Sequence, residues 1–449
     1  MIIIKIYKNF FFEEIYSILR NFLHKIYLIL GNLINSLFKN INAYLRKVNK
    51  YLKLNHINLI YYFNQTLRLF FFSKKKNLNF LSLKKYSMTK QLLTTKIFDK
   101  VTTNIFAPKI YPKKKTSLLI RPHTNIFPKV YLTKLSNVFV RSNTSLISVG
   151  NQVIFQDLYD PVKDYTSEEI NGIHSLYPQK NLVIIFDYHS FANKLVNSAA
   201  SFLTAFSNNY AHWLTEILPK IAVFCSLEKF KNIPLIIDAE LHPNIMQSLE
   251  LIVEEKREIF LLSKNLKVKV KKLYELSSIG YAPIGQKNQN FNRQGMFSPD
   301  ALRLVRNKIF AAIEHLPIKN SPKKIYLKRN SYNRILANEK EIIKVLINKG
   351  YEIIEPEKLS FLQQVSLIKN AKYILGPAGA SFGNLIFASL DSKINILAGA
   401  VENMPYWYWQ NIALTLDLKV NYILGKINNL LHGPHSNFTI DPKLILKVA

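Results

Sequence analysis

The chain has 449 residues, 48% of them hydrophobic, and a formal net charge of +32, so it is long and apolar enough to bury a core and is not a disordered tail. Its single cysteine, Cys225, excludes an intramolecular disulfide framework and a multi-cysteine zinc site, and it favours a reducing, cytoplasmic location. Only 11 of the 61 basic residues are Arg, which argues against sequence-specific nucleic-acid recognition, because that task favours the planar guanidinium.

Most of the excess charge is N-terminal. Residues 1–130 carry 24 Lys and Arg against Glu13, Glu14 and Asp99. The region holds no run of about 20 apolar residues that could span a membrane, and Glu13 and Glu14 interrupt the early apolar run that a cleavable signal would need. Two explanations of the charge stay open: AT-biased coding, or a basic, aromatic-rich, partly helical region that binds the cytoplasmic face of an anionic membrane peripherally. A helical hairpin packed on the protein's own core would give the same amphipathic pattern.

Residues 131–290 show alternating strand and helix patterns. Pro and Lys crowd residues 108–128, which indicates a connecting segment. The patterns that follow predict strands at 146–149, 153–155, 182–186, 234–238 and 259–262, and helices at 197–230 and 243–255. This alternation favours a mostly parallel sheet. We therefore expect a Rossmann-like domain at 131–290, with a polar connection at 285–298.

Residues 291–449 repeat the pattern as a second Rossmann-like domain. Five strands are predicted, at 324–329, 351–355, from 373, at 394–397 and at 420–424. Asn338 with Glu341, and Ser360 with Gln363, have the spacing of capping boxes at two helix starts. The fold class is therefore α/β.

A loop of small residues, inside YILGPAGASFGNLIF at 373–387, joins an apolar strand to a new apolar segment. In an open α/β sheet such a loop lies at the carboxyl end of a strand, where backbone N–H groups and a helix N-terminus can hold phosphate. The pattern predicts a nucleotide or diphosphate site at Gly376, Gly379, Ala380 and Ser381, with Asn384 one turn into the helix. Such turns also occur without a ligand, so the neighbouring motifs decide whether this loop is interpreted as a phosphate site.

Four sequence blocks follow one another in a fixed order: NYAHWLTEILP at 209–219, IYLKR at 325–329 with Arg334 and Asn338-Glu339, EKLSFLQQ at 357–364, and GPAGA at 376–380 with Asn384 and Phe387. Over about residues 140–425 this arrangement resembles glycosyltransferase family 61. The resemblance implies a GT-B fold, with two Rossmann-like domains facing a cleft. It also implies inverting transfer of a sugar from a nucleotide donor, often UDP-linked, to a glycan acceptor in capsular or surface polysaccharide synthesis.

One position departs from the family pattern. Many members have His between the Pro and Gly of the last block, where this chain has Ala378. If that His contacts the donor phosphate, the chain lacks one contact while keeping the backbone of the loop.

Inverting transfer needs a base that deprotonates the acceptor hydroxyl. His212 is the first candidate, because its ordinary pKa lies near 6.5. Glu216, four residues later, would share its helical face and either orient the imidazole or act as the base itself. The alternative is an amphipathic helix start in which the neighbouring apolar side chains pack inward and His212 only hydrogen-bonds.

Donor binding is expected of residues in the second half. Arg329 and Arg334 could bind diphosphate oxygens or form surface ion pairs. Glu339 could bind the ribose or only interact with the helix dipole, and Gln364 could contact the base or cap a turn.

No Asp-x-Asp motif occurs in the chain, so we expect arginine and a helix terminus to replace a metal ion, and activity that needs no cofactor. Two other function classes stay open. One is a catalytically inactive scaffold of the same fold that binds sugar or nucleotide. The least favoured is a basic nucleic-acid-binding protein.

Overall fold

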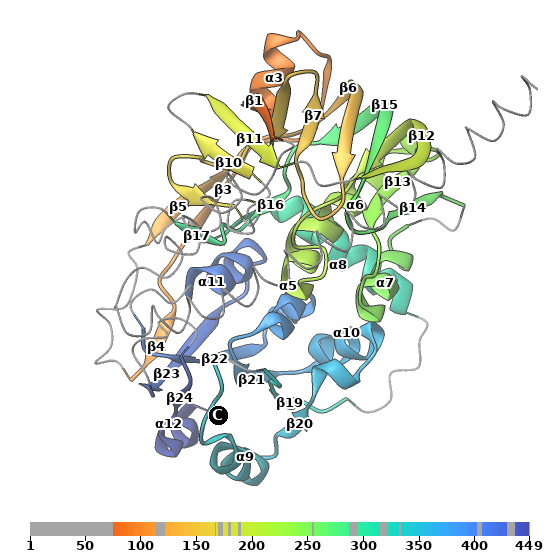
Figure 1. The fold of residues 1–449 in the computed structure, drawn as a ribbon. Coiled ribbons are helices and arrows are strands. Elements are labelled where there is room, and N and C mark those ends of the chain that lie inside the picture. The colour runs from red at the N-terminus through yellow and green to blue at the C-terminus, as the bar shows by residue number, and fades with distance from the viewer. Residues whose placement is uncertain are drawn as a thin grey trace, which may run out of the picture.

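The computed structural model describes residues 75–112, 122–166, 168, 174–177, 181–186, 190–253, 256–286, 295–314, 321–331, 334–401, 406–428 and 436–448. These residues form two large sheets with helices between them (Figure 1). Most of the predicted membrane-binding region, residues 1–74, lies outside the described residues. None of the described helices is long and apolar enough to cross a membrane.

The first sheet is mixed. Its order is β10-β11-β1-β8-β7-β6-β15-β12-β13-β14, and β2 pairs with β6. The strands are β1 Lys75–Ser82, β2 Thr94–Phe98, β6 Val130–Arg141, β7 Ile147–Val149, β8 Gln152–Phe155, β10 His174–Tyr177, β11 Leu182–Phe186, β12 Ser190–Ser201, β13 Leu235–Asp238, β14 Ile259–Leu262 and β15 Leu266–Leu276.

Parallel pairing in this sheet is confined, among the described strands, to β1 with β8 and to the run β15-β12-β13-β14. The prediction of a mostly parallel sheet was wrong here. The cause is the long antiparallel pairing of β6 with β15, from Leu132 opposite Leu276 to Arg141 opposite Lys267. In the middle of both strands buried apolar residues alternate with exposed polar ones, as at Lys134, Leu135 and Ser136 and at Lys269, Val270 and Lys271, which is the pattern of a strand with one solvated face.

Two further segments differ from their predictions. The helix expected at 197–230 begins only at Tyr210, because 190–201 is β12, whose buried Ala199 and Ala200 suit either element. The segment 108–128, expected as a connection, contains β4 Lys109–Tyr111 and β5 His123–Phe127. Strand β5 pairs with β3, Val101–Ile105, and β4 pairs in parallel with β23 of the second sheet.

The second sheet contains the five predicted strands, all parallel and in the order β20-β19-β21-β22-β23. They are β19 Lys324–Leu327, β20 Glu352–Ile354, β21 Tyr373–Pro377, β22 Lys393–Gly399 and β23 Val420–Ile427, with β24 Phe438–Thr439 antiparallel at the edge. In chain order this is 2-1-3-4-5. A doubly wound sheet of this order has its switch point between strands 1 and 3, here β19 and β21.

Apolar residues on both faces explain why this sheet is parallel. Ile325 and Ile374 pack toward the helices between the two sheets. The next residues, Tyr326 and Leu375, pack into a separate core with residues of the helices α9, Glu339–Asn348, and α12, Pro442–Val448. Successive side chains of a strand point to opposite faces, so strands covered on both sides are apolar throughout.

The helices between the sheets share one hydrophobic core. They are α5 Tyr210–His212, the π-helix η3 Trp213–Ile217, α6 Leu218–Cys225, α7 Pro243–Glu250, α8 Pro299–Ile313, α10 Phe361–Asn370, the 3₁₀-helix η7 Ala380–Phe387 and α11 Tyr406–Thr415. A Cβ atom at Gly383 would lie 3.1 Å from Cα of Ala211. Glycine therefore permits η7 to approach α5 closely.

Short elements complete the described residues: α3 Leu83–Thr89, β9 Asp164–Tyr165, η4 Glu228–Phe230, β16 Gly280–Tyr281, β17 Gly285–Gln286, β18 Met296–Phe297 and η6 Pro356–Lys358. The predicted connection at 285–298 is described only in part, and β18 within it pairs with β16.

One of the two predicted capping boxes forms. Ser360 Oγ accepts from the Gln363 N–H at 3.3 Å, and the Gln363 side chain accepts from the Ser360 N–H at 2.8 Å. Asn338 precedes α9, but its side chain accepts no bond from that helix. Its Oδ1, the atom that would cap the helix, instead accepts from the Ile440 N–H at 3.1 Å. Its Nδ2 donates to the Ile440 carbonyl at 2.8 Å and to Glu341 Oε2 at 3.0 Å. The second prediction was wrong, because a tertiary contact takes the side chain.

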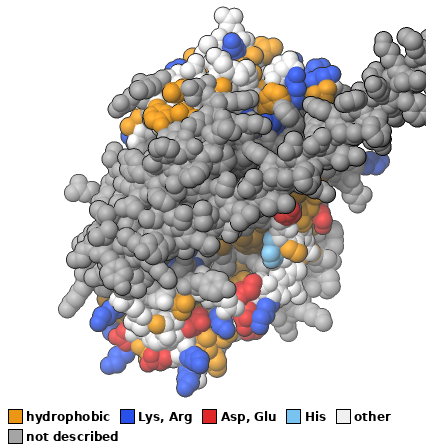
Figure 2. Space-filling view, in the orientation of Figure 1, with side chains coloured by type: hydrophobic (Ala, Val, Ile, Leu, Met, Phe, Trp, Pro, Cys, Tyr) orange, Lys and Arg blue, Asp and Glu red, His pale blue; other side chains and the backbone are white. Residues whose placement is uncertain are grey.

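Basic side chains lie in separate groups on the face that Figure 2 shows, and acidic side chains are interspersed with them on the part formed by the second sheet. Several form ion pairs at the surface, such as Lys358 with Glu355 at 2.9 Å and Arg303 with Asp417 at 2.9 Å.

Candidate active site

The first group of candidate residues lies on the helices that follow β12. Asn209 precedes α5, and its Oδ1 accepts from the backbone N–H groups of Ala211 at 3.2 Å and His212 at 3.5 Å. The chain then forms the π-helix η3. Such insertions are rare and occur often at functional sites.

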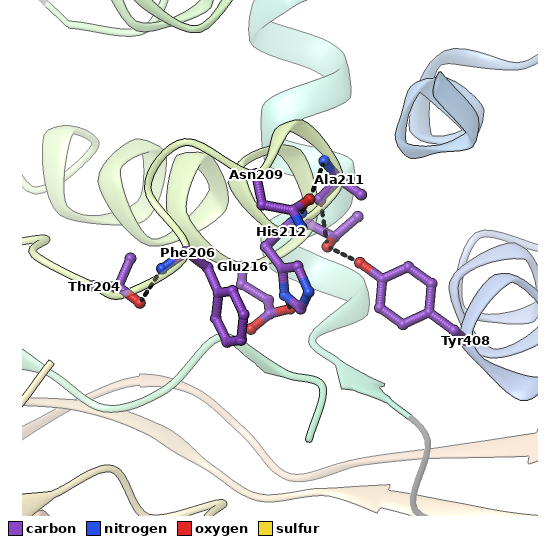
Figure 3. A network of polar contacts seen from close by, with 8 residues as sticks. Thr204, Phe206, Asn209, Ala211, His212, Glu216 and Tyr408 are labelled. Atoms are coloured by element: carbon purple, nitrogen blue, oxygen red, sulfur yellow. Dashed lines mark hydrogen bonds and ion pairs between the residues drawn. The ribbon is translucent and has the colours of Figure 1, made fainter. Parts of the chain in front are cut away.

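The imidazole of His212 is fixed from two sides (Figure 3). Its Nδ1 lies 2.6 Å from Oε1 of Glu216, and its ring stacks on Phe206 with centroids 4.1 Å apart and planes 6° from parallel. The side chains of His212 and Glu216 are 16% and 14% exposed. When Nδ1–H donates to the carboxylate, Nε2 is the nitrogen that can accept a proton. The predicted pairing of His212 with Glu216 is therefore present.

Tyr408 of α11 reaches the same place from the other side (Figure 3). Its ring centroid lies 5.9 Å from that of His212, and its hydroxyl lies 3.1 Å from Thr215 Oγ1. Thr215 already donates to the Ala211 carbonyl at 2.8 Å, so Tyr408 donates to Thr215. Burial raises the pKa of Tyr408 above its ordinary value, and the charge of Glu216 adds to this effect. Tyr408 therefore stays protonated at neutral pH.

The second group of residues lies at the switch point of the parallel sheet. Arg329 follows β19, and its Nη1 donates to the carbonyl of Ala378, just past β21, at 3.0 Å. Its Nη2 donates to Ser331 Oγ at 3.2 Å. The guanidinium thus bridges the carboxyl ends of two strands, which is where open α/β sheets bind their ligands.

Two glycines allow this arrangement for different reasons. A Cβ atom at Gly376 would lie 2.6 Å from the carbonyl oxygen of Leu327, so glycine is needed for β21 to lie beside β19. A Cβ atom at Gly379 would lie 3.0 Å from Cδ and 3.1 Å from Nε of Arg329. Gly379 has extended backbone with φ −168°. Its small size therefore matters because it leaves room for the guanidinium.

Arg334 lies beside Arg329. Burial, and then the charge of Arg334, lower the pKa of Arg329 to about 10, and burial lowers the pKa of Arg334. Within the described residues, Nε of Arg334 is buried and has no hydrogen-bond partner. Arg334 also lines a small pocket with Ala378. Two cations held together in a partly buried place favour an anion as the third member.

The loop then leads into η7, a 3₁₀-helix where the sequence suggested only a helix start. Ala380 is exposed and Ser381 is half-buried, and these are its first two residues. The first amides of a helix have no acceptor within it. The backbone after Gly379 can therefore donate to a ligand.

Residues 210–394, from α5 to the start of β22, match the family model Glycosyltransferase 61. This stretch of the chain is therefore similar to glycosyltransferase 61, and it is called the family 61 domain. This match confirms the resemblance found in the sequence. No curated protein matches the chain.

Two predicted donor residues of the family 61 domain are buried in a hydrogen-bonded relay. The hydroxyl of Tyr210 donates to Asn384 Oδ1 at 2.9 Å, Asn384 Nδ2 donates to Gln364 Oε1 at 2.8 Å, and Gln364 Nε2 donates to the Pro356 carbonyl at 2.9 Å. Asn384 and Gln364 are 2% and 5% exposed. Their polar groups are engaged within the protein, where they link α5, η7 and α10.

Glu339 is half-buried, and its Oε1 accepts from the hydroxyl of Tyr326 at 2.7 Å. Burial raises the pKa of Tyr326, and the charge of Glu339 and this hydrogen bond add to the effect. One carboxylate oxygen of Glu339 is thus occupied by the sheet beneath it.

Sequence reasoning missed two residues that contact His212 and one that acts at a distance from it. Phe206 and Tyr408 enclose the imidazole. Asp238 accepts from the N–H groups of Asn143 at 2.6 Å and Thr204 at 3.0 Å and from the hydroxyl of Ser207. It thereby orders the loop that carries Phe206. The signal for Asp238 was an acidic residue ending the apolar strand PLIID.

Among the residues that the structure describes, no group of three or more His, Cys, Asp or Glu side chains could hold a metal ion. Metal-independent activity of the family 61 domain stays a prediction.

Proposed function

We propose that the chain is an inverting glycosyltransferase that moves a sugar from a UDP-linked donor to a hydroxyl group of a glycan acceptor in the synthesis of a surface polysaccharide. One observation carries the donor half of this proposal. Arg329 bridges the ends of β19 and β21 beside Arg334, whose Nε lacks a hydrogen-bond partner among the described residues. A diphosphate at this point would accept from the guanidinium groups and from the first amides of η7.

The acceptor half rests on His212 and Glu216. The acceptor oxygen would form a bond to the anomeric carbon while the bond from that carbon to the diphosphate oxygen breaks, and its electron pair leaves with UDP. The proton of the acceptor hydroxyl would pass to Nε2 of His212. The arginines would stabilise the charge that develops on the diphosphate.

A GT-B-like arrangement is part of the proposal. The order of the parallel sheet and the contacts of Tyr210 with Asn384 and of Tyr408 with Thr215 support it. The first sheet departs from a Rossmann-like sheet, since among its described strands only β1 with β8 and the run β15-β12-β13-β14 are parallel and the other pairs are antiparallel.

Titration calorimetry with UDP tests the donor site. Charge-assisted hydrogen bonds contribute about 1.5–3 kcal/mol, so Arg334→Met, which keeps most of the apolar stem, should raise the Kd for UDP by roughly 10- to 100-fold. Arg303→Met is the matched control, because Arg303 forms an exposed ion pair with Asp417 at another place. Equal affinity of wild type and Arg334→Met would refute the assigned donor site. UDP binding without turnover of any UDP-sugar would instead favour the inactive scaffold.

Two accompanying proposals concern metal and membrane. Arginine would replace a metal ion, so turnover should persist in EDTA; loss of turnover restored by Mn²⁺ would contradict this. Peripheral binding to the cytoplasmic face of an anionic membrane should make the full chain float with anionic liposomes at low salt. With neutral liposomes the chain should remain in the bottom fraction.

A further inference from the structure

A cavity outside the donor site is lined by residues of the first sheet and of the π-helix η3. Its empty space, including the part open to solvent, is about 1020 Å³. Aromatic and aliphatic side chains form much of its lining, including Phe155 and Tyr159, which stack with centroids 5.4 Å apart. Walls that combine apolar side chains with polar groups are typical of small-molecule sites.

The cavity is continuous with the proposed catalytic residues. Glu216 and Phe206, the two side chains that hold His212, both line it. Lys220, four residues after Glu216, lines it too. A molecule in this cavity would therefore lie beside the base.

Lys220 forms an ion pair in the cavity wall. Its Nζ lies 2.6 Å from Oε1 of Glu275 in β15, and the two side chains are 20% and 10% exposed. Oε2 of Glu275 has no hydrogen-bond partner among the described residues. The negative charge of Glu275 is therefore balanced by one ammonium group and by nothing else that is described.

Carboxylate groups outnumber ammonium groups among the described residues that line the cavity. The charged members of this lining among the described residues are three carboxylates, those of Glu168, Glu216 and Glu275, and one ammonium, that of Lys220. The whole chain carries +32. Carboxylates that line a partly enclosed cavity disfavour an anionic ligand there, because like charges repel.

We propose that this cavity is the acceptor site and that it selects an uncharged sugar ring over a uronic acid, with Glu275 and Lys220 setting the charge balance. The inference rests on the proposed transferase function. The apolar walls would pack against the ring, the hydroxyl groups would bond to the groups at the rim, and the reacting hydroxyl would face His212. Glu275 acts on the acceptor through its charge and through Lys220, and is a specificity residue.

Matched methyl glycosides test this by NMR titration with UDP present: glucoside against glucuronide, and galactoside against galacturonide, in both anomers. Each pair differs only in a hydroxymethyl or a carboxylate group. For the neutral glycoside that binds best, the Kd of the matching uronide should be at least about tenfold higher than that of the neutral glycoside in the wild type. Glu275→Gln should reduce this ratio of uronide Kd to neutral Kd at least about threefold, and Lys220→Met should increase the ratio.

The opposite effects separate a charge role from a structural one, since a damaged cavity would weaken both members of a pair alike. Glu228→Gln, at an exposed position, removes the same charge elsewhere and should leave the ratio unchanged. The inference would be overturned if a uronide bound as tightly as its neutral partner, or if no pair bound at all. It would also be overturned if the ratio of the two Kd values were the same in the wild type, Glu275→Gln and Lys220→Met. The wild-type comparison holds even if a variant fails to fold. Failure of UDP to bind in the same samples would count against the proposed function instead.

Discussion

Nδ1 of His212 lies 2.6 Å from Oε1 of Glu216, across one turn of the helix that follows β12. The contact directs one imidazole nitrogen to a carboxylate and leaves Nε2 for the acceptor. It also joins His212 to the cavity, because Glu216 lines that cavity. Orientation of the base and placement of the acceptor therefore depend on one pair of residues.

Glu216→Gln should lower kcat by roughly 10- to 100-fold, because the amide no longer stabilises the protonated imidazole as the carboxylate does. His212→Ala should lower it further, by about 10²–10⁴-fold. Because the two side chains act as a unit, the double variant should be little worse than His212→Ala alone. Steady-state kinetics with matched thermal unfolding curves check this. Multiplicative losses in the double variant would show that the residues act independently.

Gly379→Ala and Gly376→Ala should separate binding from stability. The new methyl at 379 meets the side chain of Arg329, so UDP should bind about tenfold more weakly while stability changes little. The methyl at 376 meets the backbone of Leu327, which cannot yield without moving a strand, so unfolding should become about 1–3 kcal/mol easier. Calorimetry and urea unfolding of both variants provide the comparison. If Gly379→Ala and Gly376→Ala lost UDP affinity equally and stability equally, the distinction between a binding role and a structural role would be wrong.

The relay Tyr210–Asn384–Gln364 should contribute to stability. Asn384→Leu leaves the Tyr210 hydroxyl and Gln364 Oε1 unpaired, at a cost of about 1–3 kcal/mol for each buried group. Tyr210→Phe leaves one group unpaired and should cost less. Tyr177→Phe, at an exposed position, serves as the control in urea unfolding. A larger loss for Tyr210→Phe than for Asn384→Leu would show that the relay is not the cause.

Asp238 should make stability depend on pH. Burial raises its pKa above the ordinary 3.8, so the folded state holds the proton more tightly than the unfolded state. The contribution of this carboxyl group to the unfolding free energy is then full below pH 3.8 and is lost as pH rises through the folded pKa. Asp238→Asn cannot titrate. The stability of wild type minus that of Asp238→Asn should therefore fall from pH 4 to pH 7 in urea unfolding; a constant or rising difference would contradict the assignment.

The parallel sheet was predictable because its strands are buried on both faces and therefore read as short apolar runs. Tyr373–Pro377 is an example: each residue from Ile374 is buried. In the first sheet the five predicted strands form as β7, β8, β11, β13 and β14, but β12 was not predictable in this way. Ser190–Ser201 is rich in small and polar residues and resembles a helix in sequence, and its identity as β12 follows from pairing with β15 and β13.

The candidate site was predictable where a motif carried it. His212 and Glu216 are four residues apart, so one helix brings them together. Phe206 and Tyr408 were missed, because their positions beside His212 depend on a loop and on a helix almost 200 residues away. Gln364 was predicted to contact the base or to cap a turn, and its Nε2 donates to the Pro356 and Leu359 carbonyls. Asn384 was predicted to lie in the donor site, and its amide is engaged within the protein by Tyr210 and Gln364.

Release of UDP from UDP-sugars incubated with a glycan or methyl glycoside acceptor measures directly whether the chain is a glycosyltransferase. Wild type should release UDP from at least one donor, faster with acceptor than without. His212→Ala should bind UDP with unchanged affinity and release it at least about 100-fold more slowly. Unchanged release by His212→Ala, or tight UDP binding by a wild type that releases nothing from any donor, would contradict the account.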